Sequence, residues 1–155
     1  MDCIKKFNIF REEVAEYPLR DKSVTGPQDI FMICKEDLKM DRLDREVVGA
    51  FFLSAKGEVI GYHQIAEGGE SGAPVEPAII FRAALLCGSS RMILVHNHPS
   101  GDPEPSMEDL RVTERIAEGG KILSIELLDH IVIGSSGFVS IRAMNPGCFK
   151  KGGKR

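Results

Sequence analysis

Apolar side chains gather in segments of two kinds, which predict helices and strands. Helices are predicted over 27–39, 78–86 and 106–117. Pro27 and Pro77 stand where the first two begin, and Gly119-Gly120 is expected to end the third. The second segment is apolar except for Arg82, so we expect this helix to be buried on most sides.

Strands are predicted where apolar residues form short runs, namely 46–54, 59–66, 92–95, 122–128, 131–133 and 138–141. Residues 4–16 alternate loosely and form either a strand or an irregular lead-in. Met92-Ile93-Leu94-Val95 is apolar at every position, which is typical of a central strand covered on both faces. Helices that alternate with strands, together with two hairpin-like pairs, indicate an α/β sandwich with a mixed sheet.

The length and composition of the chain favour one domain. It has 155 residues, of which 43% are hydrophobic, and this is enough for a single core of ordinary size. We expect the domain to span residues 1–145, with 1–26 as a lead-in segment. The basic, glycine-rich end, residues 146–155, is expected to be a disordered tail.

Charge and cysteine content narrow the function classes. The net charge of -3 gives no support to non-specific nucleic-acid binding, which needs a basic surplus. The four cysteines form no C-x-x-C pair, which disfavours zinc ribbons and redox dithiols. No signal peptide is visible, and the apolar stretches are far shorter than the ~20 residues of a membrane span. We therefore expect a cytoplasmic protein that does not bind membranes.

Two histidines follow the predicted central strand directly. His96 and His98 are two residues apart, so an extended chain places both on one face. They lie where a strand ends, which is where open α/β sheets place their sites. Asp109 follows in the first turn of the next predicted helix. Two imidazoles and one carboxylate leave the fourth tetrahedral position to water, the pattern of a catalytic zinc site rather than a closed structural one.

Ser106 and Asp109 also have a simpler interpretation. Ser106-x-x-Asp109 matches a capping box, in which both side chains satisfy free backbone amides at the helix start. An H-x-H motif alone is weak as well. The metal interpretation gains from the combination, because the histidines follow a buried strand and a loop with three prolines leads from them to Asp109. Ser106 is able to cap the helix and to face the site.

The same residues resemble a known motif. His96-x-His98-Pro99 with Ser106-x-x-Asp109 resembles the JAMM (JAB/MPN+) metalloprotease motif, and the fuller wording Val95–Asp102 and Leu128–Gly134 resembles the RadC family within it. This resemblance covers about residues 28–141. It implies a JAB/MPN-type α-β-α sandwich and one zinc ion per chain, held by His96, His98 and Asp109. It also implies that Ser106 helps to stabilise an oxyanion.

The resemblance also assigns a role to Glu46. JAMM enzymes carry a glutamate on or just before an early strand, and Glu46, at the start of the run 46–54, matches that place. A carboxylate beside an activated water is able to take its proton and return it to the leaving group. The alternative is an exposed acid at a strand start.

Three functions stay open on the sequence alone. The first is a zinc-dependent hydrolase that cuts an amide or isopeptide bond of a peptide or protein substrate. The second is a DNA-associated module of the RadC type, active in DNA repair or in mobile elements, whose main role is not hydrolysis. The third is a non-catalytic scaffold, against which the complete motif argues. Asp129 and His130, between two predicted strands, are expected to make buried structural hydrogen bonds.

Overall fold

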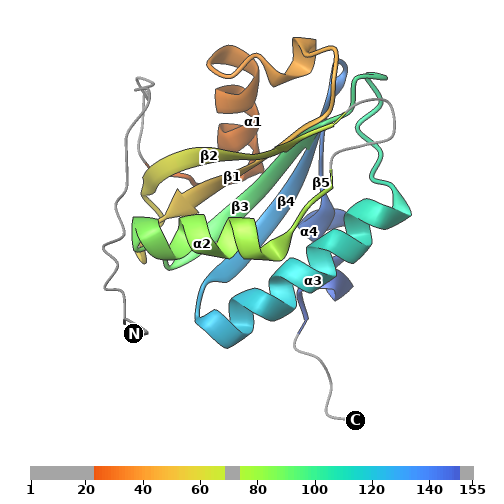
Figure 1. The fold of residues 1–155 in the computed structure, drawn as a ribbon. Helices are drawn as coiled ribbons and strands as arrows, with labels where there is room; N and C mark the ends of the chain where they lie inside the picture. The colour runs from red at the N-terminus through yellow and green to blue at the C-terminus, as the bar shows by residue number, and fades with distance from the viewer. Residues whose placement is uncertain (1–22, 69–73, 151–155) are drawn as a thin grey trace, which may run out of the picture.

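The computed structural model describes residues 23–68 and 74–150, which form a five-stranded sheet between layers of helices (Figure 1). The strands are β1 (Val47–Leu53), β2 (Val59–Glu67), β3 (Arg91–Asn97), β4 (Glu126–Gly134) and β5 (Gly137–Ser140). The helices are α1 (Pro27–Glu36), α2 (Pro77–Cys87), α3 (Met107–Leu123) and α4 (Ile141–Met144), with 3-10 turns η1 (Met40–Arg42) and η2 (Pro146–Phe149). No helix within the described ranges is long and apolar enough to cross a membrane.

The sheet is mixed, in the order β2-β1-β3-β4-β5. β1 pairs antiparallel with β2 and β3, β3 pairs parallel with β4, and β4 pairs antiparallel with β5. Parallel neighbours need a crossover connection, and α3 supplies it. The end of β3, the start of β1 and the start of α3 therefore lie at the same edge of the sheet.

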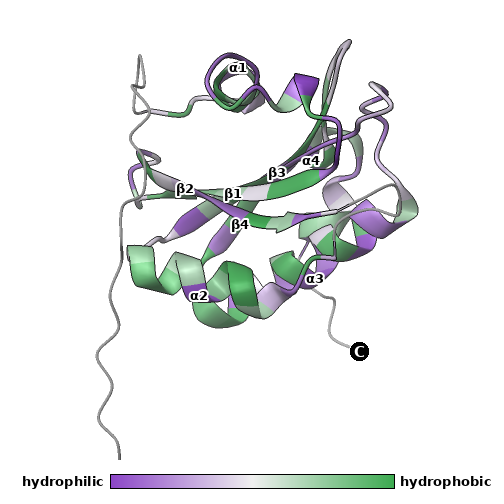
Figure 2. Cartoon of the chain, turned by 45° about the horizontal axis from the view of Figure 1, so that its top comes forward, coloured by the Kyte–Doolittle hydropathy of each residue, from purple (hydrophilic) through white to green (hydrophobic). Residues whose placement is uncertain are grey.

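Helices cover both faces of the sheet, which explains why β1 and β3 are apolar at nearly every position (Figure 2). Successive side chains of a strand point to opposite faces. Phe51 and Ile93 pack in a cluster with α1, whereas Phe52 and Leu94 pack in a cluster with α2 and α3. The predicted α/β sandwich with a mixed sheet is confirmed.

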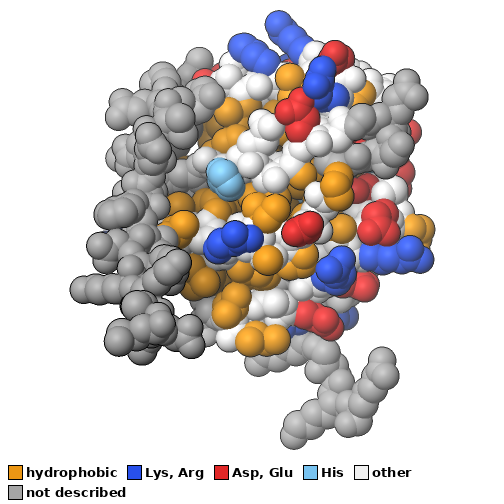
Figure 3. Space-filling model, viewed as in Figure 1, with side chains coloured by type: hydrophobic (Ala, Val, Ile, Leu, Met, Phe, Trp, Pro, Cys, Tyr) orange, Lys and Arg blue, Asp and Glu red, His pale blue; other side chains and the backbone are white. Residues whose placement is uncertain are grey.

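Apolar side chains also remain exposed on the outer surface of the helices, as the face over α2 and α3 shows (Figure 3). Among the large apolar residues of these two helices, the most exposed are Leu85, at 58%, Met107, at 67%, and Ile122, at 84%. The expectation that the segment 78–86 is buried on most sides was therefore too strong, because the outer face of α2 has no covering layer among the described residues.

The third helix does not end at Gly119-Gly120, as the sequence suggested. α3 continues to Leu123 and ends at Ser124, which adopts a left-handed conformation with φ 58°. The two glycines serve close packing instead of a helix end. A Cβ atom on Gly120 would overlap the backbone oxygen of Ile125, and one on Gly119 would lie 2.7 Å from the Phe81 ring.

Two other boundaries differ from the prediction. The runs predicted as the strands 122–128 and 131–133 become the end of α3 and the single strand β4, and Asp129 and His130 lie within that strand. Residues 146–149 are not a disordered tail, because η2 forms there and buries Cys148. Residues 151–155 and most of the predicted lead-in segment, 1–22, lie outside the described residues.

Candidate metal centre

The topology brings His96, His98 and Asp109 together at one edge of the sheet. His96 is the last residue but one of β3, His98 follows the strand, and Asp109 lies in the first turn of α3. The ligand atoms of these three side chains all lie within 4.8 Å of one another. The three residues that the sequence predicted as metal ligands are therefore neighbours. Among the described residues, they are the one group of histidine, cysteine or acidic side chains close enough together to hold a metal ion.

The contacts between the three side chains are short. The two Nε2 atoms of His96 and His98 are 3.0 Å apart. His96 Nε2 lies 3.2 Å from Asp109 Oδ1, and His98 Nε2 lies 3.5 Å from Asp109 Oδ2. The side chain of His96 is 1% exposed, whereas the side chains of His98 and Asp109 are 18% and 14% exposed. Solvent therefore reaches the group on the side where His98 and Asp109 lie.

This donor set fits a metal ion. The Nδ1 atom of His98 is 2.8 Å from the backbone oxygen of Asp102. A carbonyl oxygen only accepts, so Nδ1 carries the proton and Nε2 turns a lone pair toward His96. Two ring nitrogens 3.0 Å apart need a proton or a metal ion between them, because two lone pairs that face each other repel. Two imidazoles and a carboxylate are ligands that zinc and other divalent metals accept.

The carboxylate of Asp109 and the ring of His98 favour each other's charged forms. Burial disfavours the ionised form of Asp109, but hydrogen bonds from His96 and His98 outweigh it and hold the pKa of the carboxyl well below its usual range. The hydrogen bond to Asp109 raises the pKa of His98, against the opposing effect of burial. The site therefore contains a carboxylate at neutral pH and stabilises positive charge next to it.

Ser106 and Asp109 form the capping box as well. Ser106 Oγ accepts a hydrogen bond from the backbone N–H of Asp109 at 3.1 Å, and Asp109 Oδ2 accepts one from the backbone N–H of Ser106 at 2.6 Å. The Ser106 hydroxyl also donates to Asp109 Oδ2 at 2.7 Å. The two interpretations of the motif are thus compatible, because Oδ2 completes the cap while Oδ1 faces His96.

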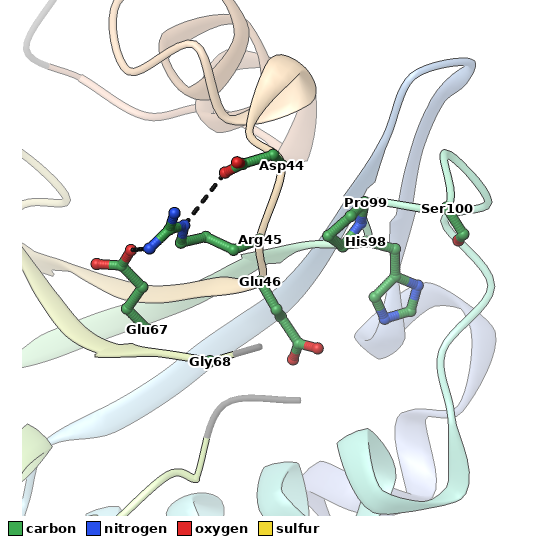
Figure 4. A pocket seen from close by; sticks show the side chains of 8 residues that line it. All are labelled: Asp44, Arg45, Glu46, Glu67, Gly68, His98, Pro99 and Ser100. Carbon is green, nitrogen blue, oxygen red and sulfur yellow. Dashed lines mark hydrogen bonds and ion pairs between the residues drawn. The ribbon is translucent and has the colours of Figure 1, made fainter. Parts of the chain in front are cut away.

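Glu46 directly precedes β1 and lines a cavity of about 930 Å³ together with His98. In Figure 4 its side chain points into this cavity, on the side of the His98 ring. The two residues meet because β1 runs antiparallel to β3, with Val48 opposite His96. The negative charge of Glu46 adds a smaller contribution to the raised pKa of His98. The catalytic role of Glu46 stays a prediction.

Asn97, between the two histidines, holds the backbone on both sides of Glu46. Its Nδ2 donates to the backbone oxygen of Arg45 at 2.9 Å, and its Oδ1 accepts from the backbone N–H of Val47 at 2.8 Å. Asn97 is 1% exposed. Sequence reasoning missed this residue. A signal was present, because His96 and His98 share one face of the extended chain and Asn97, between them, points to the other face.

His130 and Thr113 were also missed as parts of the site. His130 is 2% exposed, and its Nε2 lies 2.8 Å from Nδ1 of His96. Its Nδ1 lies 2.7 Å from Oγ1 of Thr113, which donates to the backbone oxygen of Asp109 at 2.6 Å.

The expected buried hydrogen bonds of Asp129 and His130 are confirmed. Asp129 accepts from Ser140 Oγ at 2.6 Å, whereas the partner of His130 is a candidate metal ligand.

Comparison with known proteins gives the family. A family model that describes the RadC-like JAB domain matches residues 24–146 of this chain. A UPF0758 protein of Desulfitobacterium hafniense is 41% identical over 132 residues, which are 85% of this chain and 57% of that protein. A UPF0758 protein of Methanosarcina mazei is 35% identical over 131 residues, or 84% and 56% of the two chains. The chain spans about half the length of these curated relatives, and it belongs to the family of RadC-like JAB domains.

Proposed function

We propose that this domain is a zinc-dependent hydrolase that cuts peptide or isopeptide bonds. The observation that carries the proposal is the convergence of His96, His98 and Asp109 beside a cavity lined by an unliganded glutamate, Glu46. Three protein ligands leave one tetrahedral position open, as in catalytic zinc sites. A zinc ion held there would supply Lewis acidity, which polarises a carbonyl and makes water acidic near neutral pH.

Glu46 and Ser106 supply the remaining chemistry in this proposal. Glu46 accepts the proton of the attacking water on a carboxylate oxygen and returns it to the leaving nitrogen. Ser106 is exposed, and its hydroxyl donates its proton to Asp109 Oδ2. A hydroxyl has one proton, so donation to an oxyanion requires that this hydroxyl turn away from Asp109. The cap survives the turn because Oγ keeps accepting from the Asp109 N–H.

The cavity favours a peptide or protein over a nucleic acid as the substrate. The lining residues include three acids, Asp44, Glu46 and Glu67. The one arginine among them, Arg45, is 3.1 Å from Asp44 and 3.0 Å from Glu67, so its charge is already paired (Figure 4). Phosphate binding relies on basic groups that are free to neutralise the backbone. The DNA-associated alternative gains no support from this surface.

Peptide cleavage by matched variants tests the proposal. The zinc-loaded parent, Glu46→Gln and Glu118→Gln would each be incubated with a mixture of synthetic peptides of diverse sequence, and new termini identified by mass spectrometry. Glu118 is an exposed glutamate on α3, outside the cavity, and controls for the chemical change. We expect the same cleavages from the parent and Glu118→Gln and none from Glu46→Gln, with zinc bound to all three. Equal cleavage by Glu46→Gln would contradict the role of Glu46, and no cleavage by any of them would contradict the peptidase proposal.

A further inference from the structure

A chain of hydrogen bonds joins two of the candidate metal ligands behind the site. It runs from His96 Nδ1 to His130 Nε2 at 2.8 Å, from His130 Nδ1 to Thr113 Oγ1 at 2.7 Å, and from Thr113 Oγ1 to the backbone oxygen of Asp109 at 2.6 Å. His96, His130 and Thr113 are at most 2% exposed. These three side chains are therefore shielded from solvent, and their protons must be assigned from the members of the chain.

The last member of the chain sets the direction of every proton. The carbonyl oxygen of Asp109 only accepts, so the single hydroxyl proton of Thr113 is donated to it. Thr113 Oγ1 must then accept from His130, which places the ring proton of His130 on Nδ1. A neutral imidazole has one ring proton, so Nε2 of His130 accepts from Nδ1–H of His96. The Nε2 atom of His96 is then the ring nitrogen left for a metal ion, and before a metal binds it shares a proton with Nε2 of His98, 3.0 Å away.

The opposite direction fails at one contact. If His130 carried its proton on Nε2, its Nδ1 would need the hydroxyl proton of Thr113. Thr113 Oγ1 and the Asp109 carbonyl oxygen would then face each other as two acceptors at 2.6 Å, and Thr113 is 0% exposed, so water cannot compensate its hydroxyl. The geometry accordingly selects one tautomer for both histidines.

We propose that His130 and Thr113 are positioning residues that hold the proton of His96 on Nδ1 and so reserve its Nε2, which faces His98 and Asp109, for the metal ion. This inference rests on the proposed metal site. A metal-binding histidine needs its second ring N–H held by an acceptor, which is ordinarily a carboxylate, a carbonyl or water. Here a second histidine is the acceptor, while His98 is held in the ordinary way by the Asp102 carbonyl.

Zinc affinity of four variants tests the proposal. Thr113→Val keeps the shape of the side chain and removes the hydroxyl. His130→Leu removes the acceptor, whereas His130→Gln offers an amide oxygen at about the place of Nε2. Ser89→Ala is the matched control, because Ser89 is a buried hydroxyl bonded to backbone oxygens before β3, away from the chain described above. Zinc dissociation constants would be measured at fixed pH by competition with a chromophoric chelator.

We expect zinc to bind about 10- to 100-fold more weakly to Thr113→Val and His130→Leu than to the parent, with recovery in His130→Gln and no change in Ser89→Ala. Zinc affinity of His130→Leu and Thr113→Val equal to that of the parent would overturn the inference. A parent that binds no zinc would instead overturn the proposed function.

A second measurement needs neither zinc nor a variant. The ¹⁵N shifts of the histidine ring nitrogens, recorded by NMR on the zinc-free parent, report which nitrogen of His130 carries the proton. We expect the proton on Nδ1. A proton on Nε2 would contradict the assigned direction of the chain even if zinc binds as proposed. The two failures are therefore distinguishable.

Discussion

At the scale of single residues, Asp109 belongs to a helix cap and to the candidate metal centre at once. Its Oδ2 accepts from the backbone N–H of Ser106, and its Oδ1 lies 3.2 Å from His96 Nε2. The start of α3 favours a negative charge at this position, because the free amides of the first turn carry partial positive charge. The cap thus holds the carboxylate in the orientation that a metal ligand needs.

Ser106 substitutions separate the cap from any catalytic role. Ser106→Ala should lower the free energy of unfolding by about 0.5–2 kcal/mol through the lost cap, measured by urea denaturation of the zinc-free protein. Ser106→Thr keeps the hydroxyl and should stay close to the parent. An aspartate is unsuitable here, because the Ser106 hydroxyl is 2.7 Å from Asp109 Oδ2 and a second carboxylate would repel the first. Equal stability of Ser106→Ala and the parent would show that the cap contributes nothing.

Asn97 gives a second prediction at this scale. Asn97→Ala leaves the Val47 N–H and the Arg45 carbonyl without their side-chain partner, which should cost about 1–3 kcal/mol of unfolding free energy. Because Asn97 contacts the residues on both sides of Glu46, we expect this variant to bind zinc like the parent yet to cleave peptides more slowly. Parallel measurement of zinc content and cleavage rate checks this. Loss of zinc together with cleavage would place the role of Asn97 at the ligands instead.

At the scale of elements, the register between strands determines which residues cooperate. Local patterns determine where α1 and α2 begin, at Pro27 and Pro77, and where the apolar strands lie. The sequence therefore predicted these elements. The partnership of His96 with His130 depends on the parallel pairing of β3 and β4, in which Leu94 lies opposite His130. The contact of Asn97 with Val47 depends on the pairing of β1 with β3. Local patterns do not encode such pairings, which is why these contacts were missed.

Gly120 shows the same limit and allows a test. An alanine inside a helix is ordinarily about 1 kcal/mol better than glycine, so helix propensity alone would make Gly120→Ala stabilising within α3. The structure predicts the reverse, because the added Cβ would overlap the backbone oxygen of Ile125. Thermal and urea unfolding would be compared with Glu118→Ala, an exposed position on the same helix that should change stability by less than about 0.5 kcal/mol. A more stable Gly120→Ala would contradict the close approach of α3 to Ile125.

At the scale of the whole molecule, the order of the strands assembles the site. β1 begins and β3 ends at the same edge, and the crossover through α3 starts at that edge too. Glu46, His98 and Asp109 therefore meet although they come from separate elements. The sequence predicted the metal-ligand candidates through a motif with fixed spacing, whereas the cavity beside them depends on this topology. The acidic lining of the cavity, and the pairing of Arg45 with Asp44 and Glu67, could be recognised only in the folded chain.

Zinc binding is the property on which the proposed metal centre depends. Protein purified without chelator would be analysed for metal by mass spectrometry, and zinc-free protein titrated with zinc at neutral pH by calorimetry, alongside His98→Asn and Asp109→Asn. We expect close to one zinc ion per chain, and a parent stabilised by about 2.7 kcal/mol when free zinc is 100 times the dissociation constant. Both variants should lose most of this binding. A folded parent that takes up no zinc at neutral pH, or variants that bind it as tightly as the parent, would contradict the assignment of His96, His98 and Asp109 as a metal centre.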